Sequence, residues 1–351
     1  MNQEKPDIRA LTQEELIQFF ATQNISKFRA KQVEEWLWKH RVTSFNHMNN
    51  LSLIHREMLM NNFCIKSLNI IKSNKSVDGT IKFLFRVDER KVVEGVLIPH
   101  RNRLTACISS QVGCSLSCSF CATGTLKLHR NLSFGEIYDQ AFLINQYSRK
   151  EFKKQITNIV FMGMGEPLLN TKNVLHAIKY ITDKTGMGMS GKRITVSTAG
   201  IAKIIRKIAD EKPNFNLAIS LHSANDIKRS SIMDINKTNN LSTLLDALIY
   251  FYKKTKIKPT YEYILLGGIN DSIEDAKELI DFCKKIPSKV NLIEYNKVSG
   301  LPYKKSTQKS TNLFMDILTK NNILVKLRRS RGEDIGAACG QLATQKTHDE
   351  F

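Results

Sequence analysis

Three cysteines with unusual spacing are the residues of this chain with the clearest capacity for chemistry. Cys114, Cys118 and Cys121 are separated by three and then by two residues. A four-iron, four-sulfur (4Fe–4S) cluster usually takes four cysteine thiolates, so a compact set of three leaves one iron open to an outside ligand. A structural zinc site would need a second close pair of ligands, which the sequence lacks. Buried cysteines with no shared role are the alternative, but the spacing favours an iron–sulfur cluster.

This loop, placed early in a chain of 351 residues, resembles the cluster loop of the radical S-adenosylmethionine (SAM) superfamily. The resemblance implies that the open iron binds the amino and carboxylate groups of SAM. Reductive cleavage of SAM would then give a 5′-deoxyadenosyl radical that abstracts a hydrogen atom. In such enzymes the cofactors supply the difficult chemistry, and the protein binds and orients the reacting groups.

Further candidate residues lie at the carboxyl ends of predicted strands, where ligand sites of parallel β/α folds form. Each alone is more often a turn or cap residue, but successive strands carrying such residues in phase favour a ligand pocket. Glycine allows close backbone approach, and Glu166 can accept a hydrogen bond from an ammonium group. Leu168 excludes a dinucleotide fingerprint, which needs glycine there. The candidates are Gly165, Glu166, Ser197, Ser220, Leu221, His222 and Asn296.

The C-terminal segment 331–342 carries a more specific signal around Cys339. Together with segments 110–114, 163–167 and 220–222, it closely resembles the bacterial dual-specificity methyltransferases that modify adenine C2 in 23S rRNA and tRNA. The resemblance covers nearly the whole chain and is weakest in the helical N-terminus. One departure is Gly336, where the family often has aspartate.

The family resemblance implies a role for each candidate residue. Cys114, Cys118 and Cys121 would hold the cluster, and the seven strand-end residues would line the SAM site. Cys339 would carry a methyl group, Cys107 would be its resolving partner, and Glu94 would match a proposed proton acceptor. Two SAM molecules would be used in each turnover. Inert core thiols are the alternative for the two lone cysteines, and the surrounding motif disfavours it.

Adenine chemistry explains why two cysteines outside the cluster are needed. C2 is electron-poor, so it does not attack the electrophilic methyl group of SAM. In the family's scheme Cys339 is methylated, loses a hydrogen atom from that methyl and adds to C2. Cys107 then attacks the sulfur of Cys339, and a transient disulfide forms as the methylated base leaves.

Two other functions remain open at this stage. The sibling class that methylates adenine C8 and confers antibiotic resistance shares both cysteines, but typically lacks the proline that follows Glu166 here. A non-catalytic, metal-binding RNA-binding module is supported only by the charge and the cysteines.

The composition indicates which class of partner the protein binds and in which cellular compartment it is expected. The chain has a formal net charge of +20, which favours binding to a polyanion, and nucleic acid is the leading partner. Neither a spanning apolar run nor a signal peptide is recognisable, so a cytoplasmic protein without membrane contact is expected. Because the cytoplasm is reducing, the seven cysteines are better read as ligands, catalytic groups or core residues than as structural disulfides. The resemblance implies an electron donor such as flavodoxin or ferredoxin, and a monomer is expected.

Residues 1–65 are predicted to form a small helical accessory domain that binds RNA. A capping box at Thr12 and Glu15 begins the first helix, the second covers 28–40, and the third begins near Ser52. The residues expected to face its core are Leu16, Phe19, Phe20, Val33, Trp36, Leu37, Ile54, Met58 and Leu59.

From about 66 to 110 the sequence alternates with period two, and residues 66–103 are predicted to form a β-strand extension with a hairpin turn at Asp78 and Gly79. Glu94 lies in its second strand, at 92–98, where a carboxylate usually faces solvent.

Residues 104–345 predict an α/β fold with a parallel sheet, because strands alternate with helices. The resemblance makes this a partial (β/α)6, TIM-like radical SAM barrel that ends in the catalytic-cysteine tail. Strands are expected at 156–161, 193–197, 215–220, 261–265, 290–294 and 323–326, and helices near 134–147, 171–183, 200–209, 241–254, 273–284 and 311–320.

Overall fold

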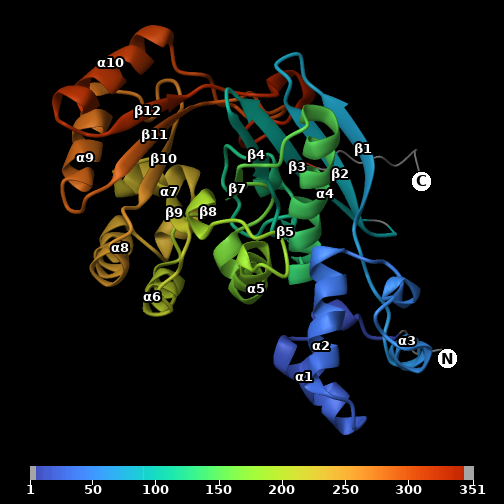
Figure 1. The fold of residues 1–351 in the computed structure, drawn as a ribbon. Helices are drawn as coiled ribbons and strands as arrows, with labels where there is room; N and C mark the ends of the chain where they lie inside the picture. Colours follow the sequence, from blue (N-terminus) through green and yellow to red (C-terminus); the bar gives the residue numbers. More distant parts are fainter. Residues whose placement is uncertain (1–4, 90, 344–351) are drawn as a thin grey trace.

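The computed structural model describes residues 5–89 and 91–343, and its main feature is a ten-stranded sheet (Figure 1). The strands lie in the order β1-β2-β3-β4-β7-β8-β9-β10-β11-β12. Their bounds are β1 (Asn69–Lys75), β2 (Ile81–Asp88), β3 (Lys91–His100), β4 (Arg103–Cys107), β7 (Asn158–Phe161), β8 (Ile194–Thr198), β9 (Asn216–Ser220), β10 (Thr260–Leu265), β11 (Lys289–Glu294) and β12 (Val325–Arg328). A separate pair joins β5 (Gln111–Val112) to β6 (Arg130–Asn131).

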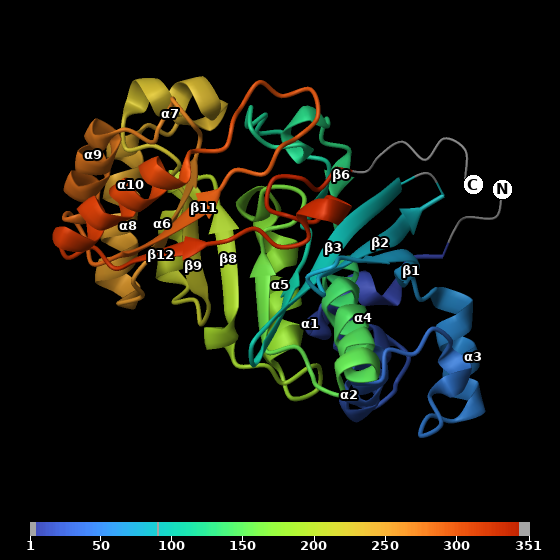
Figure 2. The ribbon, with the colours of Figure 1, turned by 90° about the horizontal axis from the view of Figure 1, so that it is seen from above.

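The long sheet has an antiparallel part and a parallel part. Strands β1 to β4 form an antiparallel meander, whereas β4 and β7 to β12 all run parallel. Helices line the outside of the curved parallel part (Figure 2), which confirms the predicted partial barrel. These helices are α4 (Phe134–Phe152), α5 (Thr171–Thr182), α6 (Ala202–Asp210), α8 (Leu241–Thr255), α9 (Ile273–Cys283) and α10 (Gln308–Lys320).

Some elements of the barrel region were not predicted individually from the sequence, among them the short strands β5 and β6. Strand β4 precedes the cluster loop and is the first parallel strand, and α7 (Asp226–Ile232) follows β9. All six expected strands and all six expected helices are present, with small shifts at their ends. No described helix is long and apolar enough to cross a membrane.

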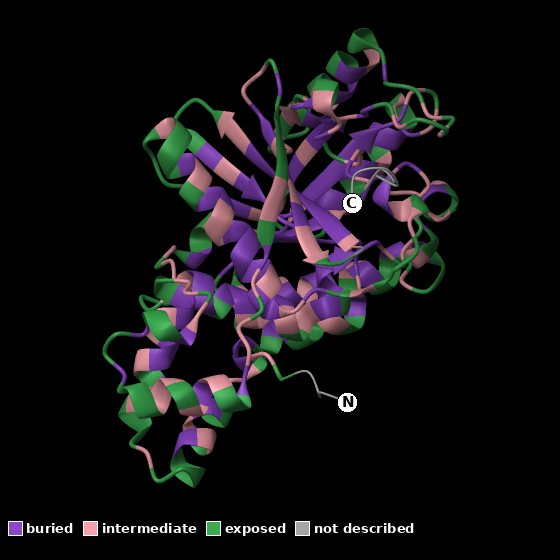
Figure 3. Ribbon diagram, turned by 90° about the vertical axis from the view of Figure 1, so that its right-hand side faces the viewer, coloured by how far each residue is buried: buried purple, intermediate pink, exposed green. Residues whose placement is uncertain are grey.

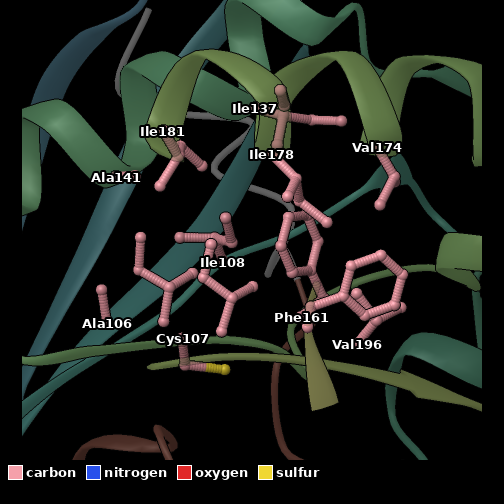
Figure 4. Packing of buried hydrophobic residues seen from close by; sticks show 14 of the residues in the cluster. Ala106, Cys107, Ile108, Ile137, Ala141, Phe161, Val174, Ile178, Ile181 and Val196 are labelled. Carbon is pink, nitrogen blue, oxygen red and sulfur yellow. The ribbon is translucent and has the colours of Figure 1, made fainter. Parts of the chain in front are cut away.

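The core lies between the sheet and its helices, and Figure 3 shows buried residues concentrated along the strands. Ile108 and Phe161 point toward α4 and α5, whereas the sulfur of Cys107 points to the other side of the sheet (Figure 4). Successive side chains of an extended chain alternate between faces, so β4 buries Ala106 under the helices and turns Cys107 toward the barrel interior.

The N-terminal helices are α1 (Gln13–Thr22), α2 (Lys27–Glu34) and α3 (Leu53–Asn62), and α1 begins at the predicted capping box of Thr12 and Glu15. One residue of their core, Trp38, was missed, and one expectation, that Ile54 faces the core, was wrong. After α2 the chain continues as a π-helical turn, Glu35–Lys39, whose wider spacing shifts the phase, so that Trp38 is buried and Trp36 only half-buried. Ile54 is 75% exposed because α3 packs through Leu59 on its other side.

The N-terminal region is fastened to α4 and α5 by aromatic and ionic contacts. Trp38 stacks on Tyr180 with ring centroids 4.1 Å apart and also packs against Phe134. Asp139 of α4 is fully buried and pairs with Arg9 and Arg41, each at 2.8 Å. Burial alone would raise the pKa of Asp139, but the two guanidinium groups hold it below its usual value.

The sheet continues across one expected domain boundary. Strand β3, in the expected extension, pairs with β4 at the start of the barrel, and one hydrophobic cluster joins the N-terminal helices to the barrel helices. The division into 1–65, 66–103 and 104–345 stays a prediction, and residues 344 and 345 lie outside the described residues.

Candidate active site

A pocket opens at the carboxyl ends of the parallel strands, where the sequence placed the ligand site. The predicted residues that line it are Cys114, Cys118, Cys121, Gly165, Glu166, Ser197, Ser220, His222 and Cys339. They come from the cluster loop, from β7, β8 and β9, and from the C-terminal tail, so the fold gathers distant segments around one cavity. Leu221, Asn296, Cys107 and Glu94 are not among the residues that line it.

The three thiols fit an iron–sulfur cluster better than a single metal ion. Among the described residues no group of three or more Cys, His, Asp and Glu side chains converges closely enough to hold one ion. In a cluster each thiolate binds a different iron, so thiols spread around one pocket are the expected arrangement. Burial raises the pKa of Cys114 to about 11 and also raises the pKa values of Cys118 and Cys121. Binding to iron would offset this cost of deprotonation.

Two glycines fix the shape of the loop that holds these thiols. A side chain at Gly124 would place its Cβ 2.5 Å from the carbonyl oxygen of Cys118. At Gly113, which has a positive φ of 79°, the Cβ would lie 2.1 Å from the carbonyl oxygen of Lys127. Both glycines allow the chain to fold back tightly on itself, so the thiols are brought together by local backbone packing.

Gly165, which follows β7, packs closely against Gln111 and also lines the pocket, so both neighbours favour a residue without a side chain. At Gly165, with φ +93°, an added Cβ would lie 2.5 Å from the Cβ of Gln111. Glu166 is buried, and its two carboxylate oxygens accept hydrogen bonds from the N–H groups of Leu168 (2.9 Å) and Ala199 (2.8 Å). Burial raises the pKa of Glu166, and these bonds oppose the rise. The remaining lone pairs can accept from an ammonium group.

His222 is a neutral donor in a strained backbone conformation. Its φ is 57°, unusual for a residue with a side chain. Its Nδ1 accepts the N–H of Ile264 at 3.1 Å, so the proton lies on Nε2. Burial, and then the charge of Arg229, lowers the pKa of His222 to about 3. The ring meets Phe120 edge to face at 4.9 Å.

Arg229 of α7 was not identified from the sequence, yet it ties the strand ends together. It is fully buried and donates to the carbonyl oxygens of Leu221 (3.0 Å), Ala199 (2.7 Å) and Ser220 (3.3 Å). Burial lowers the pKa of its guanidinium group to about 10. Since these carbonyls follow β8 and β9, Arg229 shapes the wall of the pocket.

Two of the predicted cofactor residues lie just outside the pocket lining. Leu221 is a fully buried core residue, so only its backbone lies near the strand ends. Asn296 donates its amide to the carbonyl oxygen of Cys339 at 3.2 Å. Its Oδ1 is buried and has no hydrogen-bond partner within the described residues, which leaves an acceptor for a bound molecule.

The tail that carries Cys339 is held on both sides. On one side Asp334 accepts from the hydroxyl of Ser76 (2.6 Å) in the β1–β2 turn. On the other side Ala122 in the cluster loop donates its N–H to the carbonyl oxygen of Gly340 at 2.7 Å. Cys339 itself is exposed and lines the pocket. Its thiol is therefore presented at the pocket by a fixed backbone.

Glu94 does not face solvent, contrary to the usual position of a strand carboxylate. It is 4% exposed, and its Oε1 lies 3.2 Å from the Nζ of Lys82 on the neighbouring strand. Lys82 also donates to the carbonyl oxygen of Gly336 at 3.4 Å, so the tail covers this part of the sheet. Burial raises the pKa of Glu94 and the Lys82 ammonium opposes the rise.

Comparisons with known proteins agree over nearly the whole chain. The family model described as Radical SAM superfamily matches residues 108–283, and that described as Ribosomal RNA large subunit methyltransferase N-terminal domain matches residues 7–65. The probable dual-specificity RNA methyltransferase RlmN of Cytophaga hutchinsonii is 51% identical over 97% of this chain and 94% of its own length. The dual-specificity RNA methyltransferase RlmN of Desulfotalea psychrophila is 42% identical over 99% of this chain and 97% of its own length.

A solved structure is also similar. The radical SAM methyltransferase from Sphaerobacter thermophilus has a TM-score of 0.90 and is 35% identical, covering 97% of this chain and 100% of its own. Sequence identity, domain matches and fold therefore lead to one assignment: the chain belongs to the RlmN family of dual-specificity RNA methyltransferases, within the radical SAM superfamily.

Proposed function

We propose that the protein methylates C2 of adenine in 23S rRNA and tRNA, with Cys339 as the carrier of the methyl group. The observation that carries the proposal is the exposed thiol of Cys339 in the same pocket as Cys114, Cys118 and Cys121. As a radical SAM protein, the chain uses a 4Fe–4S cluster and SAM. When bound, these cofactors supply a carbon radical that abstracts a hydrogen atom.

The proposal gives each protein group a distinct task. Cys114, Cys118 and Cys121 hold the cluster. The backbone and side chains of Gly165, Glu166, Ser197, Ser220, Leu221, His222 and Asn296 hold SAM. Glu166 receives the amino group, because it is a buried carboxylate with free lone pairs.

Cys339, Cys107 and Glu94 carry out the transfer itself. Cys339 accepts a methyl group on sulfur, and after loss of one hydrogen atom its methylene carbon adds to C2. The adduct then holds one unpaired electron, which would return to the cluster that supplied one electron at the start of the turnover. Glu94 takes the C2 proton, a role that suits a carboxylate whose pKa is raised by burial. Cys107 then attacks the sulfur of Cys339, and the disulfide releases the methylated base. Two SAM molecules are used in each turnover.

The expected partners follow from charge and chemistry. A formal net charge of +20 suits binding to 23S rRNA and tRNA in the cytoplasm. The N-terminal helices supply part of the RNA-binding surface. An electron donor such as flavodoxin or ferredoxin would reduce the cluster, and the enzyme would act as a monomer.

Single substitutions of the two lone cysteines test the proposed pathway. With anaerobic, cluster-loaded protein, SAM and labelled RNA, Cys107→Ala should accumulate protein covalently attached to RNA, because Cys339 adds to the base and is not released. Cys339→Ala and the double variant should form no such adduct. A denaturing gel separates these outcomes, and Cys283→Ala, which removes a buried thiol of α9 that does not line the pocket, is the matched control. Normal turnover by Cys107→Ala would contradict the pathway.

Nucleoside analysis tests the position of the methyl group. Mass spectrometry of digested rRNA and tRNA, against synthetic standards, should show 2-methyladenosine formed by the wild-type enzyme. 8-Methyladenosine as the product would instead assign the chain to the chemistry of the sibling class.

A further inference from the structure

Arg328 at the end of β12 reaches across the interior of the barrel. Its Nη1 donates to Oε2 of Glu262 on β10 at 3.1 Å and lies 3.6 Å from the sulfur of Met162, which follows β7. In the order of the sheet, β12 and β7 are far apart. The curvature of the sheet therefore brings the guanidinium group to Met162, which follows β7 and hydrogen-bonds Cys107 through its backbone, and Cys107 lies on β4, the strand that pairs with β7.

Glu262 holds this arginine in place. Its carboxylate is 3% exposed, and its Oε1 accepts a hydrogen bond from the side chain of Asn291 at 2.8 Å. Glu262 also lines the pocket together with Met162 and Cys339. Arg328 is thus held by a buried carboxylate that has two hydrogen-bond partners and that lines the same pocket as Cys339.

The thiol of Cys107 needs such a charge because it is buried. Burial, and then the proximity of Cys339, raises the pKa of Cys107 to about 12, and Arg328 opposes this rise. The charged and titratable groups that act on Cys107 are Cys339 and Arg328, and Arg328 in turn faces Glu262. A thiol is a poor nucleophile until it loses its proton, so a cation near Cys107 favours its attack on Cys339.

We propose that Arg328, held by Glu262, is the cation that stabilises the Cys107 thiolate during release of the methylated RNA. This inference rests on the proposed function. Arg328 is a positioning residue that acts through its charge on the sulfur, and Glu262 is the residue that orients it.

The step that it assists is balanced within the protein and the RNA. The Cys107 thiolate donates its electron pair to the sulfur of Cys339, and the S–S bond forms. The bond from the Cys339 sulfur to the methylene carbon breaks, and its electron pair leaves on that carbon. The carbon takes a proton from solvent and becomes the methyl group of the product, while the two cysteines remain as a disulfide.

The experiment follows the lifetime of the protein–RNA adduct after a change of pH. Adduct is formed at pH 7 by cluster-loaded Arg328→Gln with SAM and labelled RNA, the pH is raised, and the fraction attached is read on denaturing gels. Arg328→Gln should release RNA about tenfold more slowly than wild type at pH 7. Raising the pH by one unit should increase the release rate of Arg328→Gln about tenfold, because the thiolate fraction of Cys107 rises tenfold per pH unit below its pKa. The release rate of Arg328→Lys should lie between those of Arg328→Gln and the wild-type enzyme.

Two reference variants separate failure of this inference from failure of the proposed function. The adduct of Cys107→Ala should persist at every pH, since no thiolate can form. Arg329→Gln removes the same charge from the exposed neighbouring residue and should release RNA like wild type. Release by Arg328→Gln at the wild-type rate, or without dependence on pH, would overturn the role of Arg328 while leaving the pathway intact. Loss of SAM cleavage by Arg328→Gln would also overturn it, by assigning the residue to the pocket wall. Absence of an adduct in Cys107→Ala would overturn both.

Discussion

Replacing Asp139 by asparagine should detach the N-terminal helices from the barrel. The carboxylate of Asp139 accepts hydrogen bonds from Arg9 (2.9 and 2.8 Å), from Arg41 (2.8 and 3.3 Å) and from the N–H of Leu68 (2.8 Å). The Arg9 side chain is 1% exposed, so removing the negative charge leaves a buried cation without its counterion. Breaking a buried pair in this way costs about 3–5 kcal/mol. Carbonyl oxygens of Lys66 and Gly135 still bind Arg9, which favours the lower end of that range.

The chain offers an intrinsic probe of this detachment. Both of its tryptophans, Trp36 and Trp38, lie in the π-helical turn that packs on α4. In urea, the tryptophan fluorescence of Asp139→Asn should change at a lower concentration than the circular dichroism signal, which reports mainly on the barrel. Asp234→Asn, which removes an exposed partner of Lys237, should leave both transitions in place.

The pH dependence of the same variant has a defined sign. Because the pKa of Asp139 is lowered in the folded protein, its stabilisation is complete above the ordinary aspartate pKa of about 3.9 and is lost as the pH falls further. The difference in stability between wild type and Asp139→Asn should therefore be constant near neutral pH and shrink below about pH 4. Coincident transitions at the wild-type urea concentration would refute the idea that this ion cluster fastens the two parts.

Three other outcomes follow from the site and the charge. Cys118→Ala should lose most of the iron bound by wild-type protein after anaerobic reconstitution, because two thiolates hold a 4Fe–4S cluster poorly; unchanged iron content would reject the cluster assignment. RNA affinity should fall steeply with salt, with a log–log slope of about −0.7 to −0.9 per phosphate neutralised, as measured by filter binding; a flat response would mean that the charge of +20 does not serve RNA binding. Lys82→Met should shift the acidic limb of the methylation pH profile upward, because loss of the ammonium group lets burial raise the pKa of Glu94 further; an unshifted limb would show that Glu94 is not the base.

Most of the barrel could be predicted because its strands are short apolar runs between amphipathic helices. Strand β4 was not predicted as a separate element because Arg103–Cys107 continues the alternating pattern of the preceding strands, and its bounds are defined by pairing with β3 and β7. The inward turn of Trp38 depends on a π-helical turn that a regular period cannot predict.

The site was predictable where a motif marks it and unpredictable where distant segments meet. Spacing identified the three cluster cysteines, position at the strand ends identified the cofactor candidates, and the family resemblance gave Cys339 and Cys107 their roles. The burial of Glu94 depends on a tail that returns more than two hundred residues later to bond Lys82 through Gly336. Glu262 did carry a signal, since a carboxylate stands between Tyr261 and Tyr263 in an apolar strand, as Glu94 does in its own. Arg328 carried none, because its partners lie on other strands.

The anchoring of the tail limits how far the methyl carrier can travel. Asp334 is bound to the β1–β2 turn, and the carbonyl groups of Cys339 and Gly340 are bound to Asn296 and Ala122. With these bonds intact, the reach of the sulfur is set by rotation about the side-chain bonds of one residue. The RNA base therefore has to move to the Cys339 sulfur, because the sulfur itself travels only as far as the rotamers of its side chain allow.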